Sequence, residues 1–213
     1  INIKKIQNKY KLNIDVNGTS FLFYVQNNNT SHLYNVLATL ASIYLFVDIK
    51  KLKRNNFLFF KSPDGRGDIS KIRFKNKYIN LVDETYNSNP LSLKTAIENF
   101  DKIKIKNSKK YLILGDMLEL GKHSIKQHRL ISRIVNQTKI YKVYVVGKYI
   151  KETFKGLSSN KKAEILDNKS KIFNLINDKL NNNDYLMIKG SNSTGLNAII
   201  KKLKQKNLYA IWI

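Results

Sequence analysis

Four polar or glycine-rich segments of the sequence, each placed directly after a short apolar run, carry the side chains best suited to chemistry. Apolar runs such as YLIL, VYVV and YLMI suit strands that are buried on both faces of a parallel sheet. In open sheets of this kind, ligands bind beyond the carboxyl ends of the strands. The sequence therefore predicts one binding site, built from the carboxylates, amides and lysines of segments 83–90, 115–121, 147–148 and 189–193.

Each of these segments, taken alone, also has an ordinary structural explanation. Asp83 and Glu84 could simply end a strand, and Asn89-Pro90 could be the turn that begins the next helix. The step at residues 115–116 could be a plain strand-to-helix turn, and residues 189–191 could form a solvated loop. It is the occurrence of four such segments in one chain that favours a site.

The elements that would position these segments alternate from residue 70 onward. We predict strands at residues 71–74, 78–82, 111–114, 142–146, 163–166, 185–188 and 208–213. We predict helices near residues 91–100, 124–137, 148–155, 169–180 and 195–204, with Ser124 and Ser170 at N-cap positions. This alternation predicts an α/β fold, a Rossmann-like domain with a mostly parallel sheet.

The first part of the chain has a different pattern. Residues 10–16 and 21–25 alternate as strands do, and Asn17-Gly18 between them is a strong hairpin signal. Residues 32–46 have apolar positions at helical spacing. Pro63-Asp64-Gly65 then interrupts the pattern, so we place a boundary there and predict two parts, residues 1–62 and 63–213.

Composition narrows the classes of protein. The 213 residues include 42% apolar side chains, enough for a real core, and there is no cysteine, which excludes disulfides and thiolate metal sites. No apolar run approaches the ~20 residues of a membrane span, and residues 1–15 lack the continuous apolar core of a signal peptide. We expect a cytoplasmic protein. His123 and His128 are five positions apart, a poor spacing for shared metal ligation, so we expect structural roles for both.

The net charge of +24 has two explanations. It could indicate a nucleic-acid-binding module or an enzyme with polyanionic substrates. Alternatively, it reflects compositional drift, because lysine far exceeds arginine and the lysines are spread over nearly every predicted surface. No arginine-rich arm, zinc pattern or basic-aromatic platform accompanies the charge, so we favour drift.

Three strings resemble signatures of the Mur ligase family, in particular its MurF type. V-D-E-T-Y-N-S-N-P-L-S-L-K-T-A, which starts at Val82, is similar to the first signature. L-G-D-M-L-E-L-G-K-H-S-I-K-Q-H, which ends at His128, is similar to the second, and K-G-S-N-S from Lys189 to the third. Upstream, residues 34–38 resemble a helix start of the family and residues 63–67 its hinge into the last domain, so the resemblance covers nearly the whole chain.

The resemblance implies an ATP-dependent ligase that joins D-alanyl-D-alanine to UDP-MurNAc-tripeptide through an acyl phosphate, with ATP and Mg²⁺ as cofactors. Residues 1–62 would be the end of the central ATP-binding domain, and 63–213 the C-terminal domain. The family's phosphate loop, Gly-x-x-Gly-Lys-Thr/Ser, is missing from this sequence. We therefore expect a partial enzyme that is inactive alone and lacks most magnesium ligands. We also expect a monomer with no membrane span and no specific nucleic acid partner.

Carried over residue by residue, the resemblance also assigns roles. Asn35 would contact adenine, Arg66 would reach ATP phosphate oxygens as the catalytic group, and Asp83 or Glu84 would accept from the ribose hydroxyls. The dipeptide would be framed by Tyr86, Asn87, Asn89, Asp116, Lys189, Ser191 and Asn192. On chemical grounds, Lys189 suits the dipeptide's carboxylate and Asp116 suits its ammonium group.

Two departures from the family's pattern affect these roles. Ser31-His32 occupies the positions of a His-Asn pair that usually precedes the adenine-binding asparagine, and Glu84 stands where many relatives have aspartate.

Two alternative functions stay open. The first is another Mur-type ligase, such as a folylpolyglutamate synthase, and the second is a basic nucleic-acid-binding α/β module, which salt-sensitive DNA binding would support.

Overall fold

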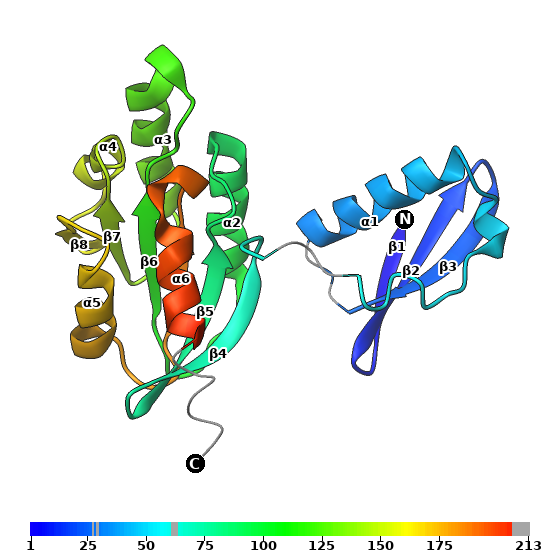
Figure 1. Cartoon of the computed structure of the whole chain (residues 1–213), viewed down its shortest axis with the longest axis horizontal. Helices are drawn as coiled ribbons and strands as arrows, with labels where there is room; N and C mark the ends of the chain where they lie inside the picture. Colours follow the sequence, from blue (N-terminus) through cyan, green and yellow to red (C-terminus); the bar gives the residue numbers. More distant parts are fainter. Residues whose placement is uncertain (27, 29, 61–63, 206–213) are drawn as a thin grey trace. The chain divides into compact units, whose positions relative to one another are not determined.

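A computed structural model describes residues 1–26, 28, 30–60 and 64–205 of the chain. The chain divides into two compact units, Ile1–Pro63 and Asp64–Ile213, which are drawn in Figure 1 and considered separately below. The strand predicted at residues 208–213 lies outside the described residues.

The first unit is a three-stranded antiparallel sheet packed against one helix. The strands are β1 (Asn2–Ile6), β2 (Lys9–Val16) and β3 (Thr19–Val25), in that order, and the helix is α1 (Thr30–Tyr44). Asn17 and Gly18 have φ of 49° and 77°, so the predicted hairpin turn is confirmed. The sequence did not predict β1, because only Ile3 and Ile6 interrupt its polar residues. A short, lysine-bearing strand is suited to the edge of a sheet.

Apolar residues of β2, β3 and α1 form the core of this unit, together with side chains from the following segment. That segment includes a short 3₁₀ helix, η1 (Ile49–Lys51). Helix α1 ends at Tyr44 rather than at residue 46 as predicted, because Phe46 N–H donates to Ile43 O in a tighter i→i−3 turn. The core consists of Leu12, Ile14, Phe23, Val25, Val36, Leu40, Ile49 and Phe57.

The second unit is built on a six-stranded sheet. Its order is β4-β5-β9-β6-β7-β8, and every neighbouring pair is parallel except β4–β5, which forms an antiparallel hairpin. The prediction of a mostly parallel sheet is therefore confirmed. The strands are β4 (Asp68–Phe74), β5 (Lys77–Glu84), β6 (Lys110–Gly115), β7 (Lys142–Val146), β8 (Lys162–Ile165) and β9 (Tyr185–Lys189).

Helices cover both faces of this sheet, as Figure 1 shows. One face packs against α2 (Pro90–Lys102), α3 (Ser124–Asn136) and α4 (Lys151–Lys155), and the other against α5 (Lys171–Lys179) and α6 (Leu196–Gln205). All six residues of β6 are buried, which explains why its sequence is a continuous apolar run rather than an alternating one. The core thus has two layers, one on each side of the sheet.

Two predicted helix starts are wrong. Ser124 is the first residue of α3 and not its N-cap, because a 3₁₀ turn, η2 (Gly121–His123), leads directly into the helix. Helix α4 begins at Lys151 rather than at residue 148, because residues 147–150 form a turn whose N–H groups bind the Asp116 carboxylate. Ser170 does occupy the N-cap position of α5, but its side chain makes no capping hydrogen bond.

Several lysines of this unit use their ammonium groups to satisfy backbone carbonyls near helix ends. Lys110 donates to Asp101 O in the last turn of α2 at 2.5 Å, and Lys77 donates to Asn177 O at 2.6 Å near the end of α5. Lys161 donates to Thr138 O at 2.7 Å and to Ile140 O at 2.9 Å, just after α3. Carbonyls at helix ends lack intrahelical partners and attract cations, so these lysines stabilise the fold.

Replacement of Lys161 by methionine should therefore destabilise the protein. Lys161 is only 7% exposed, and the change leaves the two carbonyls without their donor, which costs about 1–3 kcal/mol. The measurement is urea unfolding, with the exposed Lys151→Met as a control that removes the same charge and should stay within about 0.5 kcal/mol of wild type. Equal stability of the two variants would contradict the capping role.

Candidate functional site

The carboxyl ends of the parallel strands lie in register along one edge of the sheet. Glu84 of β5 and Leu114 of β6 both pair with Lys189 of β9, and Gly115 pairs with Val146 of β7. The four polar segments that follow these strands therefore meet at a single edge. This part of the prediction, the common location, is confirmed.

A cluster of buried charges lies at the β5–β9 end of this edge. The Lys189 ammonium is 2% exposed and lies 3.4 Å from Glu84 Oε2, and it donates to Asn87 O at 2.9 Å. Beside this pair, Asp83 Oδ2 lies 3.1 Å from the Lys204 ammonium of α6, while its Oδ1 accepts from the Thr85 hydroxyl at 2.7 Å. Asp83 and Lys189 are thus committed to contacts inside the protein.

Burial is the main influence on the Glu84–Lys189 pair. Burial raises the pKa of the Glu84 carboxyl above its ordinary value, and the nearby Lys189 only partly offsets this effect. Burial likewise lowers the pKa of the Lys189 amine, with Glu84 acting in the opposite direction. Each group is the other's main counter-charge, so removal of either would leave a buried charge unpaired.

Ser191 joins three of the four segments. Its hydroxyl donates to Ser88 O at 3.1 Å and accepts from Leu118 N–H at 2.9 Å, while its own N–H donates to Asp116 O at 3.0 Å. With 5% exposure it is an internal junction of the site. The sequence predicted Ser191 as a contact to the dipeptide, whereas the structure shows that its polar groups hold the segments together.

The segment after β5 presents its side chains in two ways. The Tyr86 ring is 44% exposed and carries the Arg66 guanidinium 4.1 Å from its centroid, so these two residues form one exposed surface. Asn87 is exposed, and its Oδ1 accepts from Ser88 N–H. Asn89 is the N-cap of α2 and forms a capping box with Ser92, so the structural explanation considered for Asn89-Pro90 holds.

Asp116 is the buried carboxylate of the segment after β6. Its Oδ1 accepts from Ile150 N–H at 2.7 Å and its Oδ2 from Lys148 N–H at 2.9 Å. Gly147 allows this approach, because a Cβ there would lie 2.6 Å from the carboxylate carbon and φ is +142°. His128 lies 4.0 Å away, and its Nε2 accepts from Met117 N–H while Nδ1 lies 2.7 Å from Ser124 O. Because Nε2 accepts from Met117 N–H, it does not donate to the Asp116 carboxylate, and His128 supports the backbone of this segment.

A pocket of about 450 Å³ opens beside Asp116, at the ends of β6, β7 and β8. This volume is in the range of small-molecule sites. Lys169 is the cationic residue of its lining. The sequence did not predict it as a site residue, because it follows the short strand β8 in a segment without a recognisable motif. The lining residues are Asp116, Leu118, Val146, Gly147, Asp167, Asn168, Lys169, Ser193 and Thr194.

Four further residues from the sequence analysis are Asn192, at the same edge, and Asn35, His123 and His32. Asn192 begins the short 3₁₀ helix η3 (Asn192–Thr194) and accepts from the Asn197 side chain at 2.8 Å. Asn35 lies on α1 of the first unit and is half-buried. His123 is exposed, whereas His32 is buried and its Nε2 has no hydrogen-bond partner among the described residues.

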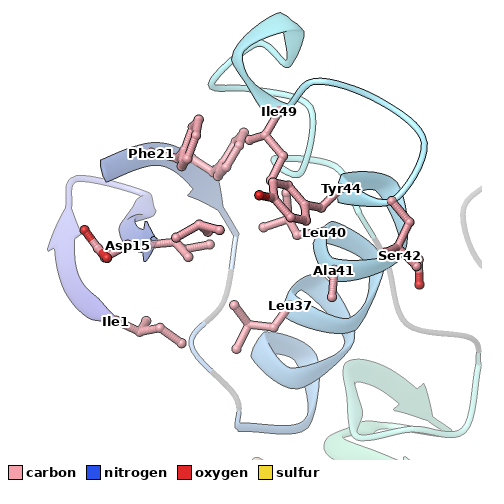
Figure 2. A pocket seen from close by; sticks show the side chains of 13 residues that line it. Ile1, Asp15, Phe21, Leu37, Leu40, Ala41, Ser42, Tyr44 and Ile49 are labelled. Atoms are coloured by element: carbon pink, nitrogen blue, oxygen red, sulfur yellow. The ribbon is translucent and has the colours of Figure 1, made fainter. Parts of the chain in front are cut away.

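The first unit has a different kind of pocket, of about 640 Å³, between its sheet and α1. Figure 2 shows Leu37 and Leu40 of α1 on one side of this pocket, with Ile1, which precedes β1, and Phe21 of β3 on the other. Its lining is almost entirely apolar and lacks the convergent polar groups that fix a ligand's orientation. We therefore do not count it as part of the candidate site.

Two further searches cover only the residues that the structure describes. No group of three or more His, Asp or Glu side chains gathers there in a way that could hold a metal ion. No helix among them is long and apolar enough to cross a membrane.

Comparisons with known proteins agree with this geometry. The chain is 28% identical over 216 residues to a UDP-N-acetylmuramoyl-tripeptide–D-alanyl-D-alanine ligase of Buchnera aphidicola subsp. Acyrthosiphon pisum, covering 94% of this chain and 45% of the relative. It is 32% identical over 129 residues to the ligase of the same name from Buchnera aphidicola subsp. Baizongia pistaciae, covering 60% of this chain and 27% of the relative. The chain thus spans less than half the length of these relatives.

Solved structures show the same fold. A MurF ligase from Thermotoga maritima, in complex with ADP, matches with a TM-score of 0.71 at 20% identity, over 99% of this chain and 46% of that one. A MurF structure from Acinetobacter baumannii matches with a TM-score of 0.74 at 19% identity, over 95% and 44%.

Residues 71–192, more than half of the chain, match the family model described as "Mur ligase, glutamate ligase domain". That span runs from β4 to the segment after β9 and includes all four loops of the site edge. The chain therefore belongs to the Mur ligase family.

Proposed function

We propose that this chain is part of a MurF-type ligase, which adds D-alanyl-D-alanine to UDP-MurNAc-tripeptide at the expense of ATP. Curated relatives with that name and solved MurF structures support the proposal. In this proposal, residues 1–62 are the end of the central ATP-binding domain and residues 63–213 are the C-terminal domain. A cytoplasmic location and a monomeric state belong to the same proposal.

The observation that carries the proposal is the way three sequence signatures, far apart in the chain, form one structure. The backbone and hydroxyl of Ser191, in the third signature, bond to Ser88 of the first and to Asp116 and Leu118 of the second. A substrate at this edge would meet all three at once. Such convergence is expected where several loops share one ligand.

The reaction needs positioning and charge neutralisation more than covalent catalysis. The tripeptide's terminal carboxylate attacks the γ-phosphorus of ATP, which releases ADP and leaves an acyl phosphate. The amine of the dipeptide then displaces phosphate to form the amide bond. Both steps are accelerated when the reactants are held in the right orientation and when fixed positive charges neutralise the phosphate oxygens.

Arg66 is the residue we assign to the phosphates. Its guanidinium is exposed and rests on the Tyr86 ring, which pre-orients a side chain that is otherwise flexible. An always-charged planar fork suits phosphate oxygens. We assign Asn35 to the adenine. Of the two alternatives for the ribose hydroxyls we choose Glu84, because Asp83 is buried and paired with Lys204. Of the residues assigned to the dipeptide, Tyr86 and Asn87 have exposed side chains, whereas Asn89 and Ser191 position the loops.

Magnesium is implied by the family, but the described residues do not fit a magnesium site. No three carboxylate or imidazole groups gather among them, and the neighbouring Asp83 and Glu84 carboxylates already face Lys204 and Lys189. We therefore assign no step to a metal held by this part of the chain.

A ligation assay tests the proposed function. In a chimaera, residues 1–213 would replace the matching segment of the Buchnera ligase from Acyrthosiphon pisum, so that a relative supplies the rest of the enzyme. With ATP, UDP-MurNAc-tripeptide and D-alanyl-D-alanine we expect ADP release and the extended peptide. The 213-residue chain alone should release no ADP, since it contains no Gly-Lys-Ser/Thr string.

The same assay separates the alternatives. A folded chimaera that extends a folate with glutamate, and not the tripeptide with dipeptide, would favour a folylpolyglutamate synthase. Binding of nonspecific DNA that weakens steeply with salt, without ligation, would favour the nucleic-acid-binding module.

A second prediction concerns Arg66. In the active chimaera, Arg66→Ala should lower kcat by about 10²–10³, the effect typical of a lost charge-stabilising contact, with little change in uridine-nucleotide binding. Arg66→Lys should recover only part of the rate, because an ammonium cannot copy the fork. Arg133→Ala, at another exposed arginine on α3, is the matched control. A kcat for Arg66→Ala within about twofold of that control would rule out the phosphate role.

A further inference from the structure

The pocket beside Asp116 is lined by one carboxylate and one ammonium group, and among residues 64–205 neither of them forms an ion pair with a lysine, an arginine or another carboxylate. It lies wholly within the second unit, at the carboxyl ends of β6, β7 and β8. The carboxylate is Asp116, and the ammonium is Lys169, from the segment between β8 and α5.

The Asp116 carboxylate has no lysine or arginine partner among the described residues of its unit. Its two oxygens accept backbone N–H groups of Lys148 and Ile150, and within 4.0 Å its only basic side chain among the described residues is His128. Its Nε2 accepts from Met117 N–H and so does not donate to the carboxylate. The protein therefore orients the carboxylate through two backbone N–H groups, while the counter-charge is left for a ligand in the pocket to supply.

The Lys169 ammonium is held by a backbone carbonyl and not by a carboxylate. Its half-buried ammonium donates to Thr194 O at 2.7 Å, and no ion pair among residues 64–205 includes it. The backbone is shaped around it, because a Cβ at Gly195 would lie 2.6 Å from Lys169 Nζ, and Gly195 has φ of +69°. A carbonyl holds the ammonium in place but satisfies only one of its three donors.

The other charged residue of the lining is already paired. Asp167 lies 2.5 Å from the Lys171 ammonium. The hydroxyl-bearing residues Ser193 and Thr194 complete the rim near Lys169. The pocket lining thus has one carboxylate, Asp116, and one ammonium, Lys169, that are available to pair with charges of a ligand.

We propose that this pocket binds the zwitterionic amine substrate, with the substrate's ammonium at Asp116 and its carboxylate at Lys169. This inference rests on the proposed function and names the residue that recognises the carboxylate. Sequence reasoning chose Lys189 for that task, but its ammonium is 2% exposed, faces Glu84 and Asn87, and is not part of the pocket lining. Lys189 is a positioning residue.

The charge pattern also predicts specificity. A dipeptide with one ammonium and one carboxylate matches the single open pair. Glutamate brings a second carboxylate, which would meet no second open cation and would lie near Asp116 or Asp167. Like charges placed together weaken binding, so the pocket should prefer D-alanyl-D-alanine to glutamate.

The test is a titration of the isotope-labelled 213-residue chain, followed by NMR chemical shifts, with D-alanyl-D-alanine as the probe. Its C-terminal amide analogue removes the carboxylate without any change in the protein. We expect the amide to bind about tenfold more weakly, or worse, because a charge-assisted contact to Lys169 is lost. Shifts should appear at Gly147, Thr194 and Gly195.

Variants of Lys169 remove the same contact from the protein side. Lys169→Met should bind the dipeptide as weakly as wild type binds the amide, and it should no longer distinguish the two ligands. Lys169→Arg should recover part of the affinity. Lys201→Met, at an exposed lysine on α6, removes the same net charge and should leave binding unchanged. No binding of the dipeptide, equal binding of its amide, or a Lys169→Met affinity within twofold of wild type would each overturn the proposal.

These outcomes are separable from failure of the proposed function. If the chimaera ligates the dipeptide but Lys169→Met has an unchanged KM for it, only the pocket assignment fails. If the chain binds the dipeptide through Lys169 but the chimaera produces no ligation product, the pocket assignment stands and the proposed reaction fails.

Discussion

The arrangement of the site edge depends on one carboxylate. Asp116 follows β6 and accepts hydrogen bonds from the turn after β7, while its backbone carbonyl accepts from Ser191 after β9. Three loops that are distant in the sequence are thereby held in fixed positions. The same bonds keep residues 147–150 out of helix α4 and require glycine at position 147. Because both carboxylate oxygens receive neutral N–H groups, the residue can organise the edge and still present a negative charge to a ligand.

Part of the positive charge of the chain has a structural use. Lys77, Lys110 and Lys161 donate to carbonyls near helix ends, and burial lowers the pKa of each amine. Lys189 pairs with Glu84 inside the site. These long side chains place their ammonium groups on backbone acceptors while their stems cover apolar surface. Net charge alone therefore says little about the partner, which agrees with the dispersed pattern of lysines in the sequence.

The two lysines near the site show how motif and function can separate. Lys189 belongs to a recognisable signature, yet it is buried and holds the segment after β5 in place. Lys169 belongs to no signature, yet it lines a pocket and has no ion-pair partner among the described residues of its unit. Recognition of a carboxylate requires a cation that can exchange its contacts with a ligand. A cation already paired in the interior can instead fix the geometry that other residues use.

The sequence by itself determined the alternation of strands and helices, the mostly parallel sheet and the common edge of the four polar segments. Those features follow from local hydrophobic patterns and from the rule that parallel strands end together. It also determined the Asn17-Gly18 hairpin, whose conformation depends on two residues alone. It missed β1 and the true starts of α3 and α4. Only the tertiary structure decided which polar groups are paired, because pairing depends on contacts such as Ser191 with Ser88 and Lys189 with Asn87, each across about a hundred residues. Residue type and spacing do not encode such distances, so the division between positioning groups and groups open to a ligand emerged from the fold.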